Sequence, residues 1–414
     1  MKQRHISLES PFHVELSPST PDVDPVPHPF SRPHVPKSLR SAIHLVRRWR
    51  APRLGSYAPV SMLELPEHRP VRASMPTIDF HTHLGRWLSN TGDWMEPDVG
   101  RLLDLMDSCN VTCLVNLDGR WGRELEDNLN RYDRAHPGRF FSFCHVDWRV
   151  LDEPDGPDLL VKSLRRSVAM GACGLKIWKD LGFTIEARGR RVLPDDPMLS
   201  SLWDAAGELG VPVLIHVADP VAFFHPVDRH NERVEELLRV PKTSRHTGGM
   251  SEFRRLVDSL ERVVASHRDT AIVGAHATYV ENLAWVSDMF DRYPNFYIDI
   301  AARAAELGRQ PRATRALLTK HPNRVLFGTD IFPVRSSTYH TYFRLLETDD
   351  EAFPYSDEAV PPCGRWPIYG LDLPASILEH LYRKNAEHLL RLGRKLPRDP
   401  QESIAVPRGI SHSL

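Results

Sequence analysis

The chain has 414 residues, and 53 lysines and arginines against 54 aspartates and glutamates leave a formal net charge of −1. This balance creates no field that favours a polyanion or an anionic membrane surface, so the sequence predicts neither a nucleic-acid nor a membrane partner. A hydrophobic fraction of 41 % supports an ordinary core, and five cysteines without a Cys-x-x-Cys pair fit a reducing, cytoplasmic setting rather than a disulfide scaffold.

The first 74 residues differ from the rest of the chain. Prolines recur from Pro11 to Pro36, where they remove backbone donors and break helices. A basic stretch at 38–53 fits an amphipathic helix that packs on the body, and a helix for a membrane surface or an anionic partner is the alternative. We therefore expect a Pro-rich N-terminal extension over 1–74, one folded domain over 75–393 and a C-terminal tail over 394–414.

From Met75 onward, short β-rich runs alternate with runs of helical period. The strand candidates are Pro76–His81, Val111–Asp118, Arg139–Asp147, Cys173–Trp178, Val211–Val217, Ala271–His276, Phe296–Ile300 and Arg324–Asp330. The helix candidates lie near 98–109, 122–135, 157–170, 196–209, 251–267, 281–292, 309–320 and 374–392. Eight strands that each lead into a helix predict an α/β fold with a parallel sheet, closed most economically as a (β/α)8 TIM barrel. A doubly wound open sheet is the alternative, although no GxGxxG turn follows the first strand.

Two connections are longer than structural turns require. They span 218–250, after the fifth strand, and 331–373, after the eighth, so both lie on the face where barrels carry their chemistry. Phe223 in the first connection, and Arg303 after the seventh strand, suit a planar or carboxylated small molecule, because a guanidinium forms bidentate bonds and an aromatic face stacks. Structural ion pairs with nearby acids are the alternative for the arginines.

The strongest local motif is the Asp79-Phe80-His81-Thr82-His83 segment at the end of the first predicted strand. Side chains alternate along a strand, so we expect Asp79, His81 and His83 on one face, directed into the barrel. Two imidazoles spaced in this way can reach one metal ion, and an aspartate beside them can orient a ligand. The motif also arises by chance, so it is weak evidence alone.

Three further strands present a polar residue at the same end. The fifth ends in His216, the sixth in His276 and the eighth in Asp330. A buried polar residue bonded to the backbone would explain any one of them, but matched positions on strands far apart in the sequence favour a common site. A barrel brings these ends around one mouth, so we expect His81, His83, His216 and Asp330 to converge on one cation.

This combination resembles the amidohydrolase superfamily, in particular the amidohydrolase-related branch that contains the aminocarboxymuconate semialdehyde decarboxylase-like enzymes. The resemblance covers roughly 75–392 and includes the closing Tyr382-Arg-Lys-Asn385-Ala386 segment. It is specific for the superfamily and says little about the substrate. It implies a metal-dependent TIM-barrel enzyme.

The resemblance also implies roles for the strand-end residues. His81, His83 and His216 would be metal ligands, His276 a ligand or a transition-state stabiliser, and Asp330 both a ligand and the proton carrier. The residue chemistry agrees, since a divalent ion lowers the pKa of a water to about 7 and polarises a carbonyl. We expect one divalent metal ion, Zn²⁺ before Mn²⁺, Fe²⁺ or Co²⁺.

Lys176 and Trp178 lie on the same face at the end of the fourth predicted strand. We expect both to bind substrate, with a protonated Lys176 on a substrate carboxylate. A carbamylated Lys176 that bridges a second metal, or an ordinary lysine paired with an acid, is the alternative. His145 and Asp147 end the third strand in a similar position, where a plain hydrogen-bonded role explains them equally well.

The sequence thus predicts a metal-dependent hydrolase acting on a C–N or C–O bond, as in an amide, lactone or ester, of a small carboxylated molecule. The alternative is a nonoxidative decarboxylase with the same metal ligands. A barrel kept only as a binding module is a third hypothesis, and the loss of a ligand that would favour it is not seen. The partner is a small-molecule substrate, and a homo-oligomer is left open.

Overall fold

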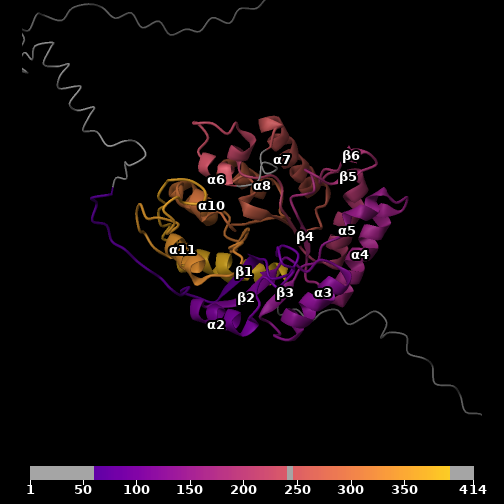
Figure 1. Ribbon diagram of the computed structural model, residues 1–414, viewed down its shortest axis with the longest axis horizontal. Coiled ribbons are helices and arrows are strands. Elements are labelled where there is room, and N and C mark those ends of the chain that lie inside the picture. Colours follow the sequence, from indigo (N-terminus) through magenta and orange to yellow (C-terminus); the bar gives the residue numbers. More distant parts are fainter. Residues whose placement is uncertain (1–59, 240–245, 392–414) are drawn as a thin grey trace, which may run out of the picture. The chain divides into compact units, whose positions relative to one another are not determined.

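The computed structural model describes residues 60–239 and 246–391 (Figure 1). The described residues from Leu65 onward form one compact unit. The predicted basic helix at 38–53 and the predicted tail at 394–414 lie outside the described residues. The predicted division at residue 74 stays a prediction.

Eight parallel strands follow one another in the order β1-β2-β3-β4-β7-β8-β9-β10. They are β1 (Thr77–Thr82), β2 (Val111–Asn116), β3 (Phe140–Ser142), β4 (Leu175–Ile177), β7 (Val213–Ile215), β8 (Ile272–Gly274), β9 (Phe296–Asp299) and β10 (Val325–Leu326). A separate antiparallel hairpin joins β5 (Glu186–Ala187) to β6 (Arg190–Arg191). Each predicted strand is present, but most are shorter than predicted, because regular pairing stops before the polar residues at their ends.

The strands close into a ring. A parallel bridge between Cys144 and Leu175 joins the β1-β2-β3 sheet to the β4 end of the other sheet. On the opposite side, the amide of Phe80 donates to the carbonyl of Phe327 at 2.9 Å, and the amide of Asp330 donates to the carbonyl of His81 at 2.8 Å. The predicted TIM barrel is therefore confirmed.

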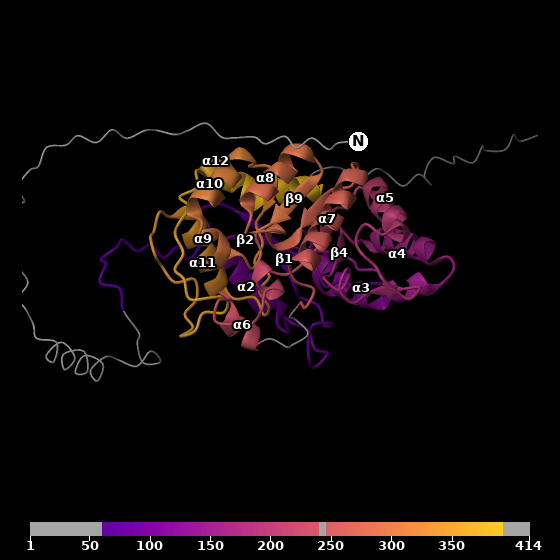
Figure 2. The ribbon, with the colours of Figure 1, turned by 90° about the horizontal axis from the view of Figure 1, so that it is seen from above.

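Helices surround the ring (Figures 1 and 2). They are α2 (Val99–Cys109), α3 (Gly122–Leu129), α4 (Gly156–Met170), α5 (Ser200–Leu209), α6 (Val234–Arg239), α7 (Gly249–Ser266), α8 (Leu283–Arg292), α9 (Ala304–Gly308), α10 (Pro311–Lys320), α11 (Ser336–Glu347), α12 (Ala375–Glu379) and α13 (Asn385–Leu389). Their ends follow local chemistry: Asp98 caps α2 by accepting from the Arg101 amide, and Gly171 ends α4 at a φ of 124°. None of the described helices is long and apolar enough to cross a bilayer.

The core has two layers. Apolar side chains that alternate along the strands fill the interior of the ring, among them Ile78, Phe80, Leu214 and Leu326. Ala386 and Leu389 of α13 join this cluster. A larger cluster lies between the strands and the surrounding helices. The carboxyl ends of the strands are thereby left for polar residues.

Both long connections contain structure of their own. The one after β7 holds a 3-10 turn at Val221–Phe224 and helix α6. The one after β10 holds helix α11, which the sequence reading treated as loop. Ahead of β1, the His68 ring contacts the buried Asp350 at 2.5 Å, so this stretch is held on the barrel.

Candidate metal centre and active site

A cluster of histidines around one carboxylate lies at the carboxyl ends of β1, β8 and β10. Asp330 Oδ1 is 3.1 Å from His83 Nε2 and 3.5 Å from His81 Nε2. The other oxygen, Oδ2, is 3.8 Å from His276 Nε2. His81, His83 and Asp330 each offer a ligand atom within 4.8 Å of the others, as a common metal ion requires. The strand ends therefore do meet at one point.

The second nitrogen of three histidines is held by an acceptor. His81 Nδ1 donates to Asp299 at 2.8 Å, and His83 Nδ1 donates to Asp118 at 2.6 Å. His276 Nδ1 donates to the Ala301 carbonyl at 2.9 Å. These bonds fix the ring orientation and leave each Nε2 free to bind a cation, the arrangement that metal-binding histidines usually have.

The backbone at the strand exits is unusual. His276 and Asp330 have φ values of 58° and 57°, in the left-handed region that non-glycine residues seldom adopt. Such a conformation costs roughly 1–3 kcal/mol and is commonly found at functional sites. Gly328 is the second unusual feature, because the missing Cβ allows a close approach to His81: an added Cβ there would lie 2.9 Å from the Cβ of His81. Close packing of β10 on β1 brings Asp330 to the histidines.

The unbonded atoms of the cluster fit a divalent cation. In the described part of the chain, Nε2 of His81, His83 and His216 is buried without a hydrogen-bond partner. Neutral imidazoles and one carboxylate are suitable ligands for Zn²⁺, Mn²⁺, Fe²⁺ or Co²⁺. His216 lies beside the cluster rather than within its tightest group: its ring centroid is 4.5 Å from that of His276.

Burial and the charges within the cluster shift the pKa values of its residues. Burial lowers the pKa of His81 and takes that of His276 to about 3, so both are neutral at neutral pH. Burial alone would also lower the pKa of His83, but the Asp118 carboxylate raises it to about 9. Burial opposes ionisation of Asp330, yet the surrounding histidines hold the pKa of this carboxyl well below its usual range. A cation would displace the proton from His83.

Asp79 does not share the face of the two histidines, contrary to the prediction from strand alternation. Its neighbours Ile78 and Phe80 point into the barrel, and the register of β1 shifts between Asp79 and Thr82. Asp79 instead accepts hydrogen bonds from the Thr329 hydroxyl at 2.6 Å and the Tyr339 hydroxyl at 2.9 Å. It ties β1 to the segment that carries Asp330.

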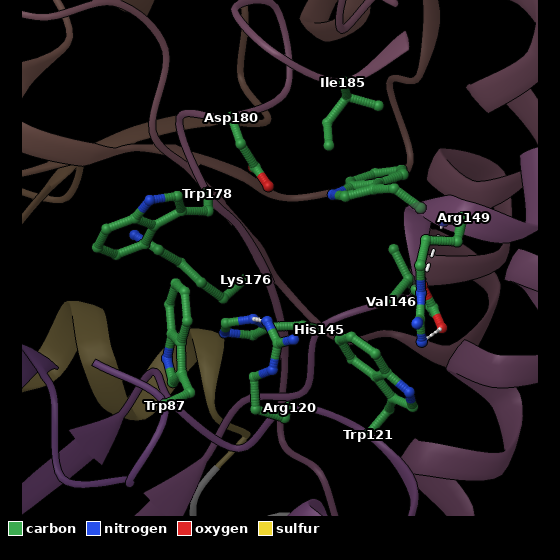
Figure 3. A pocket seen from close by; sticks show the side chains of 12 residues that line it. Trp87, Arg120, Trp121, His145, Val146, Arg149, Lys176, Trp178, Asp180 and Ile185 are labelled. Atoms are coloured by element: carbon green, nitrogen blue, oxygen red, sulfur yellow. Dashed lines mark hydrogen bonds and ion pairs between the residues drawn. The ribbon is translucent and has the colours of Figure 1, made fainter. Parts of the chain in front are cut away.

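Figure 3 shows a cavity of about 390 Å³, and Trp178 in its wall packs against His83 of the cluster. Lys176 and Trp178, both predicted to bind substrate, line it. Lys176 is 1 % exposed, its Nζ has no hydrogen-bond partner among the described residues, and it lies 5.4 Å from the centre of the Trp178 ring. Burial lowers the pKa of Lys176 to about 8. The other lining residues are Trp87, Arg120, Trp121, His145, Val146, Asp147, Trp148, Arg149, Asp180 and Ile185.

The other two predicted substrate residues do not line this cavity. Phe223 packs in the outer hydrophobic cluster. Arg303 borders a much smaller cavity of about 10 Å³ beside His216 and His276. Arg233 in the first long connection forms a buried ion pair with Glu306, as the structural alternative for the loop arginines proposed.

Sequence reasoning missed several residues of the site. The sequence predicts Asp118 only as the end of a strand, whereas the structure places it as the acceptor of the His83 Nδ1 hydrogen bond. Trp87 and Trp121 gave no periodic signal, because they come from connections after β1 and β2. His145 donates from Nε2 to the Leu117 carbonyl at 2.6 Å, in keeping with the predicted hydrogen-bonded role.

Comparisons with known proteins agree with this geometry. A family model described as Amidohydrolase matches residues 120–392. No curated protein sequence matches the chain.

Among solved structures, the chain is similar to an uncharacterized TIM-barrel protein from Bordetella bronchiseptica, with 14 % identity and a TM-score of 0.51, covering 77 % of this chain and 99 % of that one. It is also similar to a 2,6-dihydroxybenzoate decarboxylase from Rhizobium, with 18 % identity, a TM-score of 0.51 and the same two coverages. A third is a dihydroxybenzoic acid decarboxylase from a Polaromonas species with bound manganese and 2-nitroresorcinol, with 15 % identity, a TM-score of 0.51, and 78 % and 98 % coverage.

These likenesses in fold accompany a family match over most of the barrel. The cluster of His81, His83, His276 and Asp330 lies at the carboxyl ends of the strands of that barrel. The chain belongs to the amidohydrolase family.

Proposed function

We propose that this chain is a metal-dependent decarboxylase that removes CO₂, without oxidation, from a planar aromatic or unsaturated carboxylic acid. The observation that carries the proposal is the position of Lys176. Its buried amino group has no hydrogen-bond partner among the described residues, and it lines the cavity beside Trp178, whose ring packs against His83 of the cluster. A buried cation without an acid is suited to bind an anionic group of a ligand.

The shape of the cavity supports a planar ligand. Its volume of about 390 Å³ is within the range of small-molecule sites. The Trp87 and Trp178 rings pack edge to face, with centroids 5.1 Å apart. Trp178 also packs against His83, which connects the aromatic wall to the cluster. An aromatic ring on this wall would place its carboxylate near Lys176.

The residues of the cluster would divide the reaction among them. His81, His83, His216 and Asp330, with His276 beside them, would hold a divalent cation, and such an ion supplies positive charge that polarises a carboxylate or a neighbouring hydroxyl. Lys176 would form an ion pair with the substrate anion. As the bond to the carboxyl carbon breaks, CO₂ leaves and the electron pair that remains on the ring carbon takes up a proton. Asp330, at the centre of the cluster, is positioned to take that proton from water and pass it to the ring carbon.

The named relatives add support for this reaction. Two of the similar solved structures are named as decarboxylases of dihydroxybenzoic acids, and one of them holds manganese. The proposal therefore puts the decarboxylase, which the sequence reading gave as its alternative, before the hydrolase. It also places Mn²⁺ beside Zn²⁺ as a candidate metal.

Hydrolysis is the second candidate, and one observation favours it. The histidines hold the pKa of Asp330 well below its usual range, so this carboxyl is ionised at neutral pH. An ionised carboxylate can accept a proton from the attacking water, whereas it has no proton of its own to donate to a carbon atom. The same cluster would then serve an amide, lactone or ester.

The test is a metal-loaded assay that measures both products. Protein with either Zn²⁺ or Mn²⁺ is incubated with hydroxybenzoates, aromatic lactones and anilides, and released CO₂ is measured beside released acid. We expect CO₂ from the hydroxybenzoates; acid release without CO₂ would show hydrolysis instead. His81→Ala should lose the metal, and Asp330→Asn should lose turnover more than fold, whereas His388→Ala, on α13, should change neither. Wild-type metal content and rate in both cluster variants would refute the site.

A further inference from the structure

Arg120 stands in the wall of the same cavity, on the connection after β2. Its guanidinium lies 4.2 Å from the centre of the Trp121 ring and 4.9 Å from that of Trp87 (Figure 3). Both rings also line the cavity, as does Lys176. The two tryptophans hold the guanidinium plane by cation–π contact and leave its N–H edges for another partner.

That partner is not an acid of the protein. Within the described ranges, no carboxylate lies within 4.0 Å of Arg120 in an ion pair. Its polar side-chain contact is to His145 Nδ1 at 3.4 Å, and burial keeps this histidine neutral by lowering its pKa to about 3. Arg149, the other arginine of the cavity, is already paired with Asp147 at 2.6 Å. Arg120 is thus a cation without a counter-charge in contact.

The backbone holds Arg120 in this place. Its φ of 59° is in the left-handed region, and its carbonyl accepts a hydrogen bond of 2.8 Å from the His145 amide. This hydrogen bond to the segment after β3 holds Arg120 in a strained backbone conformation. The position of Arg120 is therefore fixed, and its backbone is not free to move as that of an exposed loop residue would be. Asp180 also lines the cavity. Its Oδ1 accepts a hydrogen bond from the Leu181 amide, and the carboxylate can accept another from a ligand hydroxyl.

We infer that Arg120 determines substrate specificity by binding a second anionic group, so that the substrate is a planar aromatic dicarboxylate. This inference rests on the proposed function and adds the class of acid. One anionic group lies toward Lys176 and the metal ligands, and the other is held by the N–H groups of Arg120. A guanidinium is matched to a carboxylate because it offers two parallel donors.

The experiment compares ligands that differ by one carboxylate. Protein loaded with Mn²⁺ is titrated with 2-hydroxybenzoate, 4-hydroxyisophthalate and 2-hydroxyterephthalate, and binding is followed by quenching of tryptophan fluorescence, which needs no turnover. Wild type should bind one of the dianions at least tenfold more tightly than the monoanion. Arg120→Met should lose that preference and leave binding of 2-hydroxybenzoate within about threefold. Arg165→Met, an exposed change on α4, should behave as wild type.

Each other result has a definite meaning. Equal weakening of monoanion and dianions in Arg120→Met, or no preference in wild type, overturns the inference. Arg120→Lys keeps the positive charge but lacks the two parallel donors of the guanidinium, so it should retain part of the preference for dianions. It replaces Arg120→Met in the test if the Met variant does not fold. Arg120-dependent dianion binding without CO₂ release would refute decarboxylation and leave the inference standing. CO₂ release that is equal from all three acids, and independent of Arg120, would refute the inference about Arg120 and leave the proposed decarboxylation standing.

Discussion

Lys176 is a residue whose burial opposes folding. Lys176 is 1 % exposed, its amino group has no hydrogen-bond partner among the described residues, and burial lowers its pKa to about 8 from the 10.5 of a free lysine. The unfolded chain therefore binds more protons between these two values. Stability is penalised in full below pH 8, and the penalty disappears as the pH rises through 10.5.

Lys176→Met should accordingly stabilise the metal-free protein while it abolishes turnover. We expect a gain of about 1–3 kcal/mol in the free energy of unfolding at pH 7, because a methionine fills the same space without the cost of an unsatisfied polar group. Urea unfolding at pH 7 and pH 10 measures it, and the gain should shrink at pH 10. A variant less stable than wild type at pH 7 would show that the amine has a partner in the folded state.

The pH dependence of metal binding follows from His83. The Asp118 carboxylate raises the pKa of His83 to about 9, although burial opposes this, so the imidazole is protonated at pH 7 in the metal-free protein. A cation needs the neutral form and must release that proton. The apparent affinity should rise up to about tenfold per pH unit between pH 6 and 8, and fall in acid.

Calorimetry of metal binding in two buffers of different ionisation enthalpy counts the released protons directly. Wild type should release close to one proton at pH 7. Asp118→Asn removes the carboxylate that raises the pKa, so it should release fewer. Proton-neutral binding by wild type would contradict the assignment of His83 as a ligand.

At the scale of residues, the sequence predicted the polar side chains at the carboxyl ends of the strands. His81, His83, His276 and Asp330 follow apolar runs, so their common position could be inferred without coordinates. The residues of the cavity wall could not be inferred in this way, because Trp87 and Arg120 come from irregular connections whose paths depend on tertiary packing. Arg303 had the right chemistry but lies beside the smaller cavity.

At the scale of elements, the approach of β10 to β1 is set by a glycine. Gly328→Ala would place a methyl group 2.9 Å from the Cβ of His81, a contact closer than packed side chains accept. We expect the variant to fold with metal affinity reduced at least tenfold, as measured by titration of metal-free protein. Gly100→Ala, in the first turn of α2, is the matched control and should bind as wild type. Unchanged affinity in Gly328→Ala would show that β10 can move without disturbing His81.

Element prediction succeeded where the periodicity was clear and failed where it was interrupted. The eight strands follow from short β-rich runs such as Val213–Ile215. The register shift in β1 could not be read from alternation, and this is why Asp79 was assigned to the wrong face. Helix α11 was missed because it lies within a long connection, although Tyr342, Phe343 and Leu346 are buried along it.

At the scale of the whole molecule, a metal ion held by three strand ends should stabilise the barrel against unfolding. The ion binds the folded chain, so free ion at a hundred times its dissociation constant adds about 2.7 kcal/mol. Removal by a chelator should therefore lower Tm, and calorimetry with and without the chelator measures the change. His81→Ala, which lacks a ligand, should show little difference between the two conditions. A wild-type Tm that does not respond to the chelator would argue against a bound ion.

The ring closure has a consequence for biosynthesis. Asp79 on β1 meets Thr329, at the far side of the seam, across 250 positions of sequence. At about 5–20 residues per second, the ribosome needs roughly 10–50 seconds to deliver the missing neighbour of the first strand. During that interval the nascent chain exposes an unpaired edge and an interior not yet covered by α13, and this is the period in which chaperones would have to guard it against aggregation.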